Sequence, residues 1–216
     1  MNSDVTDEEA RVDGRHARRE RGRIAVIDAM LELLREGGAP PDVEQLAACA
    51  GVSASSIFRY FGSVEDLQRH TFEGFLERYR PLLEAPLVAG HGLDARVRAF
   101  VTARVRFYEE TAAILRVARV RALEHRQLAQ NAADMKRLLS EQVETHFAAE
   151  LDALMSRARA DEVAMLIDSL TAPEAWDALV LIHERSSRQV RRSWEWAIHA
   201  LVDRARADGS MPPPEA

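Results

Sequence analysis

Residues 42–61 limit the possible folds more than any other part of the chain, because they predict two short helices joined by a tight turn. Gly51 supplies the positive φ that ends the first helix, and Ser53 is a good N-cap for the second. Ala47 is small enough for the two helices to cross closely. We therefore predict a helix-turn-helix whose core residues are Val43, Leu46, Ala47, Gly51, Val52, Ile57 and Phe61.

Helical periodicity continues through nearly all of the remaining chain, and no alternating strand pattern of useful length interrupts it. Turn residues and prolines divide this pattern, most densely in residues 81–92. We predict an all-α fold made of a flexible arm (1–17), a helical head (18–80), a larger helical body (81–208) and a disordered tail (209–216). Helices are expected at about 18–36, three short segments ending before Pro81, 93–110, 111–126, 128–157, 161–184 and 187–206.

The second helix of residues 42–61 leaves short polar and basic side chains on its outer face. Such a surface suits a helix that enters the major groove of DNA, because Arg can bind guanine and Ser or Tyr can bind phosphate. An ordinary antiparallel helix pair joined by a glycine turn is the alternative. The predicted DNA contacts are Ser53, Ala54, Ser55, Ser56, Arg59 and Tyr60.

A basic segment overlaps the start of the first long helix. Residues 11–23 contain six arginines against two acids, a local charge of +4, whereas the whole chain carries −6. Contact with nucleic acid must therefore be local. We predict that Arg15, Arg18 and Arg19 assist DNA binding, with a solvated helix face as the alternative.

Four short motifs resemble the tetracycline-repressor (TetR) family of regulators in order and spacing: Val43-Glu-Gln-Leu-Ala47, Ala50-Gly-Val-Ser53, Ser56-Ile-Phe-Arg-Tyr-Phe61 and Ser63-Val-Glu-Asp-Leu67. The resemblance covers roughly residues 18–80. It implies a three-helix DNA-binding head, a linking fourth helix, and a helical body that binds a small-molecule effector and dimerises. A bulky dimer over a promoter would block polymerase, so the function expected first is a repressor that the effector releases from a palindromic operator. Activation of transcription is the alternative that the sequence leaves open.

Three positions depart from the family pattern. Asp42 stands where a phosphate-contacting Thr or Ser is usual, Phe58 where Tyr is common, and Val64 where a Lys often contacts the DNA backbone. Neither an acid nor an apolar side chain can make those contacts, so either affinity is lower than is usual in the family or the arginines of residues 15–23 compensate. Tyr60 matches the position where the family places a phosphate-binding His or Tyr.

One strongly apolar stripe runs along the last predicted helix. It either fills the core of its own protomer or joins the preceding helix in a four-helix dimer seam, as the family places its last two helices. Dimerisation would set two recognition helices about 34 Å apart on double-stranded DNA. The predicted homodimer interface is Trp176, Val180, His183, Val190, Trp194, Ile198 and Leu201.

The middle helices mix apolar and polar side chains, as an effector cavity would require. Core packing or a surface position is the alternative for each of them. Arg104 stands out because it falls near the apolar stripe of Phe100, Val101, Val105 and Tyr108. A buried guanidinium there needs an acid or an anionic ligand, unless Arg104 lies at the edge of the stripe and reaches solvent. The predicted effector site is Phe100, Arg104, Tyr108, His125, Met135, Gln142, His146 and Phe147.

The sequence holds no phosphate-binding loop, di-iron or zinc motif, or nucleophile elbow, so we predict no catalytic residue, no metal ligand and no cofactor. Two other functions are kept as alternatives: a protein-interaction or adaptor module with a degenerate helix-turn-helix, and a helical enzyme without local motifs. The single cysteine excludes an internal disulfide. A polar N-terminus and the lack of a long uncharged apolar run predict a cytoplasmic protein without membrane contact.

Overall fold

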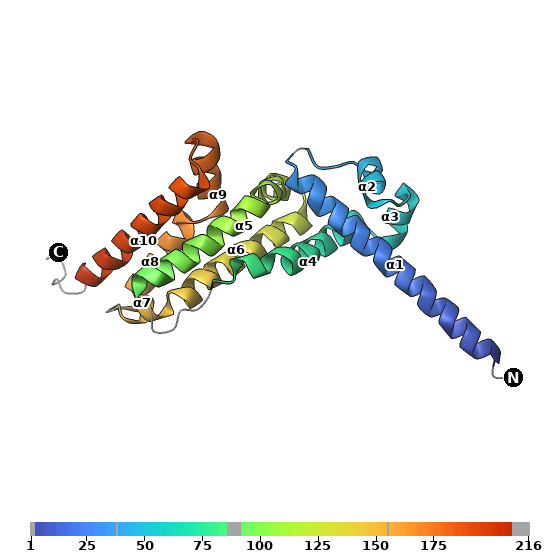
Figure 1. Ribbon diagram of the computed structural model, residues 1–216, viewed down its shortest axis with the longest axis horizontal. Helices are drawn as coiled ribbons and strands as arrows, with labels where there is room; N and C mark the ends of the chain where they lie inside the picture. Colours follow the sequence, from blue (N-terminus) through green and yellow to red (C-terminus); the bar gives the residue numbers. More distant parts are fainter. Residues whose placement is uncertain (1–2, 38, 86–91, 155, 209–216) are drawn as a thin grey trace. The chain divides into compact units, whose positions relative to one another are not determined.

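The computed structural model describes residues 3–37, 39–85, 92–154 and 156–208, and it describes side chains from residue 16 onward. Within these residues every regular element is a helix, so the predicted all-α class is confirmed (Figure 1). The predicted tail, residues 209–216, lies outside the described residues. None of the described helices combines the length and the apolar run that crossing a bilayer requires.

The elements in chain order are α1 (Ser3–Arg35), α2 (Val43–Ala50), α3 (Ala54–Tyr60), α4 (Val64–Leu83), α5 (Leu93–Ala122), α6 (Arg126–His146), α7 (Ala148–Asp152), α8 (Arg157–Leu170), α9 (Pro173–Asp177), the π-helical turn η1 (Ala178–Ile182) and α10 (Ser187–Asp208). The chain divides into two compact units. We call residues 1–78 with 117–131 the head unit, and residues 79–116 with 132–216 the body unit.

Several helices differ in extent from the expected ones. α1 begins at Ser3, and residues 3–17, expected as a flexible arm, contain no proline to prevent the helix from starting early. The prediction that the helices end before Pro81 is wrong, because α4 continues to Leu83. Pro81 lies in the last turn of α4, where the loss of one backbone hydrogen bond is tolerated. The helix expected over residues 161–184 is divided at Pro173, which begins α9 at the position where proline fits best.

α5 is a single helix where two were expected, on either side of residue 110. Neither Glu110 nor Thr111 is a helix breaker. The Thr111 hydroxyl donates a hydrogen bond to the Phe107 carbonyl one turn earlier at 2.6 Å, which keeps this buried polar group satisfied inside the helix. The absence of Gly and Pro between residues 93 and 122 would have been the signal for one helix.

Helices α1, α2 and α3 pack around a small apolar core in the head unit. Every side chain of this core is at most 6% exposed. Because six apolar side chains from three helices share one cluster, the positions of α2 and α3 on α1 are fixed by burial. The core residues are Val26, Ala29, Leu46, Ala47, Ile57 and Phe61.

The body unit has a larger core built on α5. Aromatic rings from α5, α9 and α10 meet there: the ring centroids of Tyr108 and Trp176 lie 5.6 Å apart, and those of Trp176 and Trp194 lie 6.0 Å apart. α10 packs against α8 and η1. Polar groups also lie inside this core, unlike in the core of α1–α3.

Candidate nucleic-acid interface

The first helix of the turn motif is started by Asp42. Its Oδ1 accepts a hydrogen bond from the Gln45 backbone N–H at 2.7 Å, while the Gln45 side-chain Oε1 accepts from the Asp42 N–H at 3.0 Å. This reciprocal pair is a capping box, which satisfies two amides at the start of α2. The acid that departs from the family pattern therefore has a structural role at the helix start.

The turn between α2 and α3 depends on one glycine. Gly51 has φ 66° and ψ 31°, the left-handed conformation in which residues other than glycine are strained. The next residue, Val52, donates its N–H to the Ala47 carbonyl at 3.0 Å and packs against the head core. This arrangement ends α2 within one residue and directs the chain into α3.

Hydroxyl groups and one arginine are held together at the exposed side of α3. The Ser53 hydroxyl accepts from the Ser56 N–H at 3.2 Å and lies within 3.0 Å of the hydroxyls of Ser55 and Ser56. The Arg59 guanidinium donates to the Ser56 hydroxyl at 3.1 Å. Arg59 is therefore exposed, yet oriented by its own helix before any partner arrives.

The remaining residues of α3 divide between surface and core. Phe58 is 64% exposed, Tyr60 and Ala54 are half-buried against the head core, and Ile57 is buried within it. Val64, at the start of α4, is 56% exposed. The outer surface of the turn motif thus mixes hydroxyls, an arginine and two exposed apolar side chains.

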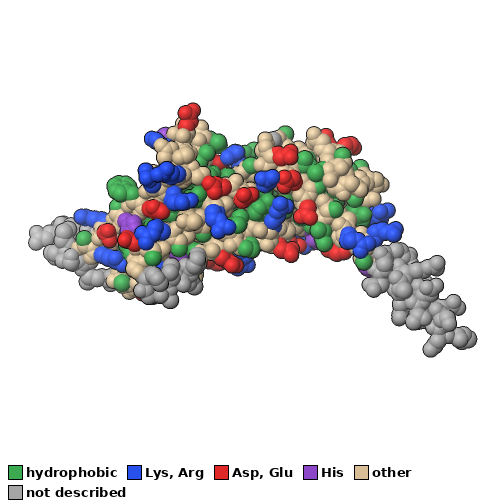
Figure 2. Space-filling model, viewed as in Figure 1, with side chains coloured by type: hydrophobic (Ala, Val, Ile, Leu, Met, Phe, Trp, Pro, Cys, Tyr) green, Lys and Arg blue, Asp and Glu red, His purple; other side chains and the backbone are tan. Residues whose placement is uncertain are grey.

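Basic side chains of α1 contact the C-terminal end of α3. The Arg19 guanidinium donates to the Arg59 carbonyl at 3.2 Å, and the Arg23 guanidinium lies 5.6 Å from the centre of the Phe61 ring. Arg18 is exposed on the same helix, whereas the side chain of Arg15 lies outside the described residues. Figure 2 shows blue, basic side chains gathered at this end of the head, and those of α1 and α3 are all arginines.

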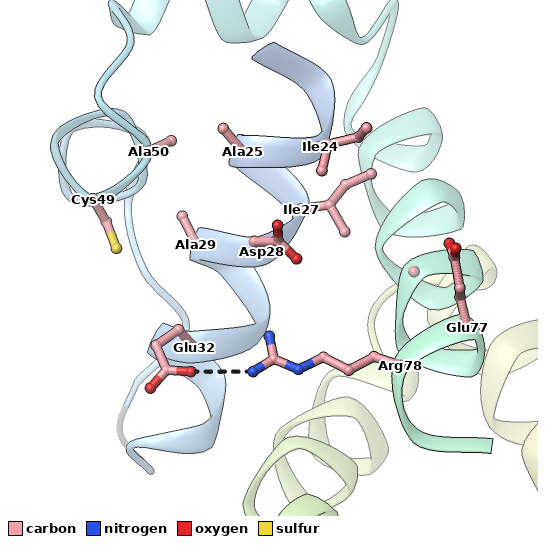
Figure 3. A pocket seen from close by; sticks show the side chains of 11 residues that line it. Ile24, Ala25, Ile27, Asp28, Ala29, Glu32, Cys49, Ala50, Glu77 and Arg78 are labelled. Carbon is pink, nitrogen blue, oxygen red and sulfur yellow. Dashed lines mark ion pairs between the residues drawn. The ribbon is translucent and has the colours of Figure 1, made fainter. Parts of the chain in front are cut away.

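A groove of about 760 Å³ lies elsewhere on the head unit, between α1, α2 and α4 (Figure 3). Most of its lining residues are apolar, and the acids among them are Asp28, Glu32 and Glu77. Arg78 reaches toward Glu32 at 3.9 Å, and a hydrogen bond from Arg35 lowers the pKa of Glu32. Since three acids face one arginine of the lining, this groove disfavours DNA phosphate, in contrast to the basic surface of α1 and α3.

The predicted effector-site residues lie mostly in the packed core of the body. Phe100 contacts the rings of His146 and Phe147, with centroids 5.6 and 5.1 Å away, and the Arg104 guanidinium lies 4.9 Å from the Phe100 ring centre. Arg104 also donates to the Leu139 carbonyl at 2.9 Å. All four predicted side chains are buried, which fits the core-packing alternative.

The other members of that predicted set are spread more widely. Met135 is buried, and Gln142 donates a hydrogen bond to the Leu83 carbonyl. Tyr108 donates to the Thr171 carbonyl at 2.8 Å, and burial raises its pKa to about 12. His125 belongs to the head unit, where it contacts Arg121. A second groove, about 320 Å³ between α6, α7 and α8, is lined by none of the predicted residues.

The apolar stripe of the last helix lies in the core of its own protomer. Val190, Trp194 and Ile198 are at most 1% exposed, and Trp176 is 5% exposed. These four side chains therefore cannot form the surface of a dimer seam, because other parts of the same protomer already cover them. Of the other predicted interface residues, His183 is exposed, and Val180 and Leu201 are half-buried.

No protein-family model and no curated protein matches the sequence. Solved structures do match the fold. A transcriptional regulator from Rhodococcus sp. RHA1 is 17% identical, with a TM-score of 0.64 over 87% of this chain and 97% of that chain. A TetR-family regulator from Rhodococcus sp. is 16% identical, with a TM-score of 0.65 over 85% of this chain and 99% of that one. A third, a TetR-family regulator from Streptomyces coelicolor, is 19% identical, with a TM-score of 0.61 over 88% and 90%.

The chain has the fold of the TetR-family regulators. The fold implied by the motifs of residues 43–67 is thereby confirmed, although at these identities the likeness concerns the fold alone. In this TetR-like fold, α1–α3 correspond to the expected three-helix head. Sequence reasoning overlooked Gly22 of α1, whose role depends on a residue of α3; the only signal was a glycine inside a helical pattern.

Proposed function

We propose that this protein is a DNA-binding transcriptional regulator that reads a palindromic operator as a homodimer. The observation that carries the proposal is the exposed, ordered face of α3, where Arg59 is held on a row of serine hydroxyls by a 3.1 Å hydrogen bond. A pre-oriented arginine loses less conformational entropy when it binds guanine in the major groove. The likeness of the fold to transcriptional regulators from Rhodococcus supports the same function.

Electrostatics support this assignment of the binding face. The net charge of −6 repels DNA from most of the surface, and the acidic groove of the head does so locally. Arg18, Arg19 and Arg59 instead lie at the end where α1 and α3 meet. Arg18 and Arg19 can contact phosphate where Asp42 and Val64 cannot, which compensates for the departures from the family pattern.

The homodimer is proposed to form through η1 and α10. The side chains in contact would be the exposed ones of these elements, because the stripe of Val190, Trp194 and Ile198 is buried. Leu181 and Ile182 of η1 are 56% and 75% exposed, and Trp196 of α10 is 75% exposed. η1 and α10 pack against each other. Large exposed apolar side chains on neighbouring elements are typical of a protein–protein interface. Trp196→Glu should shift the protein to monomers in sedimentation velocity, whereas Ala158→Glu, which adds the same charge at an exposed position of α8, should leave the dimer intact.

A small-molecule effector is proposed to release the operator, and Arg104 is the group in the body most suited to bind it. No carboxylate among the described residues lies within ion-pair distance of this fully buried guanidinium. Burial raises the pKa of Asp168, and the charge of Arg104 opposes that rise. A ligand carboxylate would supply the missing charge. Benzoate and octanoate should weaken DNA binding by the wild type and have no effect on Arg104→Met.

The decisive experiment is fluorescence anisotropy with duplex DNA from the region upstream of the gene, in the presence of scrambled competitor. Between about 50 and 200 mM salt, binding should weaken by roughly a thousandfold if six to ten phosphates are contacted. Arg59→Ala should weaken specific binding by about tenfold or more. Arg157→Ala is the matched control, because it removes the same charge from a side chain of the body that is 83% exposed. Absence of binding even at low salt would favour the adaptor alternative.

A further inference from the structure

Gly22 lies directly beneath the ring of Tyr60. A Cβ atom built on Gly22 would lie 2.5 Å from the Tyr60 Oη, 2.6 Å from its Cζ and 2.7 Å from its Cε2. Real Cβ atoms do not approach other heavy atoms so closely. The phenol ring of α3 therefore rests on the backbone of α1, in a notch that only glycine leaves open.

The neighbours of Tyr60 are held by the same face of α1. Arg19 binds the Arg59 carbonyl at 3.2 Å, and the guanidinium of Arg23 lies 5.6 Å from the Phe61 ring centre. Residues 19, 22 and 23 are three and four positions apart, so they lie on one face of a helix. Three consecutive residues at the end of α3 are thus each contacted by this one face.

The ring of Tyr60 also affects Arg59. The Arg59 guanidinium lies 5.7 Å from the Tyr60 ring centre, so the two side chains that are proposed to contact DNA touch each other. A displaced Tyr60 ring would remove one side of the surroundings that orient Arg59. The notch at Gly22 therefore bears on both contacts.

Helix propensity makes glycine an unfavourable choice at this position. Within a helix, glycine is less stable than alanine because it loses more backbone freedom on folding. An alanine at position 22 should therefore strengthen α1 by itself. The glycine is explained by the contact with Tyr60, which any larger side chain at position 22 would prevent.

We propose that Gly22 is a positioning residue for DNA recognition: it seats the Tyr60 ring on α1 and thereby fixes how Tyr60 and Arg59 face the DNA. The inference rests on the proposed function of α3 in DNA binding. It predicts that a single methyl group at position 22 turns the Tyr60 ring away from α1 toward solvent. The Tyr60 side chain can rotate, so the overall fold survives the change.

The first measurement needs no DNA. The chain has three tyrosines, and Tyr79 and Tyr108 are 3% and 1% exposed, so nitration by tetranitromethane followed by peptide mass spectrometry reports on Tyr60. Gly22→Ala should nitrate at Tyr60 several times faster than the wild type. An unchanged nitration rate at Tyr60 would overturn the inference whether or not the protein binds DNA.

The second measurement is a double-mutant cycle in the anisotropy assay at low salt. Gly22→Ala should weaken specific binding by about tenfold in the wild-type background and by less than about twofold in the Tyr60→Ala background, because the two changes act on one contact. Equal losses in both backgrounds would overturn the inference. If the wild type itself binds no DNA, the proposed function fails, and the nitration result still tests the seat of Tyr60.

Gly74→Ala is the matched control. A Cβ there would lie 2.6 Å from Cγ2 of Ile27, so it crowds the same helix α1 at another site. A general disturbance of α1 would make both glycine variants behave alike. We expect Gly74→Ala to lower the thermal midpoint without faster nitration of Tyr60, and Gly22→Ala to show faster nitration without a lower midpoint.

Discussion

The core enclosed by α1–α3 and the core of the body unit differ in chemistry. In the head, α1–α3 enclose six apolar side chains from residues 26–61 and no polar one. In the body, the core also encloses Arg104, His146 and Glu150, each of which has a hydrogen-bond partner 35 to 54 residues away in the sequence. The α1–α3 core thus depends on apolar burial between neighbouring segments, whereas the body core also depends on polar contacts between distant ones.

The largest expected effect removes one side chain of the apolar head core. Leu46 is 2% exposed, so Leu46→Ala should lower stability by about 2–5 kcal/mol through lost burial and the cavity that remains. The three tryptophans all belong to the body unit, so their fluorescence reports on the body alone. Specific DNA binding should disappear on warming before the tryptophan signal changes. Simultaneous loss of both would show that the two units unfold as one.

The second effect breaks a buried ion pair in the body. Glu150 is 1% exposed and accepts hydrogen bonds from the Arg96 guanidinium, so Glu150→Ala removes the carboxylate that neutralises this cation. We expect a loss of about 3 kcal/mol, at the lower end for such pairs because the Arg96 side chain keeps 20% exposure. Urea unfolding followed by tryptophan fluorescence measures it. Glu162→Ala, which removes an exposed pair with Arg159, should cost less than about 1 kcal/mol.

A third, smaller effect concerns the turn of the head. Gly51→Ala forces a side chain into the left-handed conformation at φ 66°, at a cost of about 1–2 kcal/mol. The cost is conformational only, since no atom lies within 4 Å of the new Cβ. Gly62→Ala is the control: its surroundings are equally open, and its φ is not positive. Equal stability of the two variants in thermal unfolding would refute the conformational argument.

The head was predictable because its signals act locally. Gly51 and Ser53 determine the backbone at their own positions, and the helices that they separate pack against each other. Even the departure at Asp42 has a local explanation, the capping box with Gln45. The notch at Gly22 was not predictable, because nothing near position 22 indicates that Tyr60 will lie above it.

The body was predictable only in its fold class. An apolar stripe such as Val190, Trp194 and Ile198 has the same spacing whether its partner lies in the same protomer or in another, so the sequence left both alternatives open. Similarly, Phe100 and His146 have the composition of a ligand site but pack against each other. Distant contacts of this kind leave no local pattern.

The smallest expected effect is a pH dependence confined to the body. Burial lowers the pKa of His146, and its Nε2 donates to the Arg96 carbonyl at 2.9 Å, which partly opposes the shift. Below the unfolded pKa of about 6.5 the unfolded chain binds a proton that the folded chain does not. The contribution of His146 to the free energy of unfolding is therefore fully present above that pH. It is lost as the pH falls toward the lower folded pKa, by at most about 1.4 kcal/mol per pH unit.

His146→Gln keeps a donor for the Arg96 carbonyl and removes the titration. Its urea midpoint, followed by tryptophan fluorescence, should fall less between about pH 7 and 5 than that of the wild type. His16→Gln, which changes an exposed histidine of α1, should leave the wild-type pH dependence unchanged. The core of α1–α3 contains no titratable group, so the comparison predicts no matching loss in the head. Identical pH profiles for His146→Gln and the wild type would assign the pH dependence of stability to other groups. The titratable histidine would then no longer distinguish the body core from the core of α1–α3.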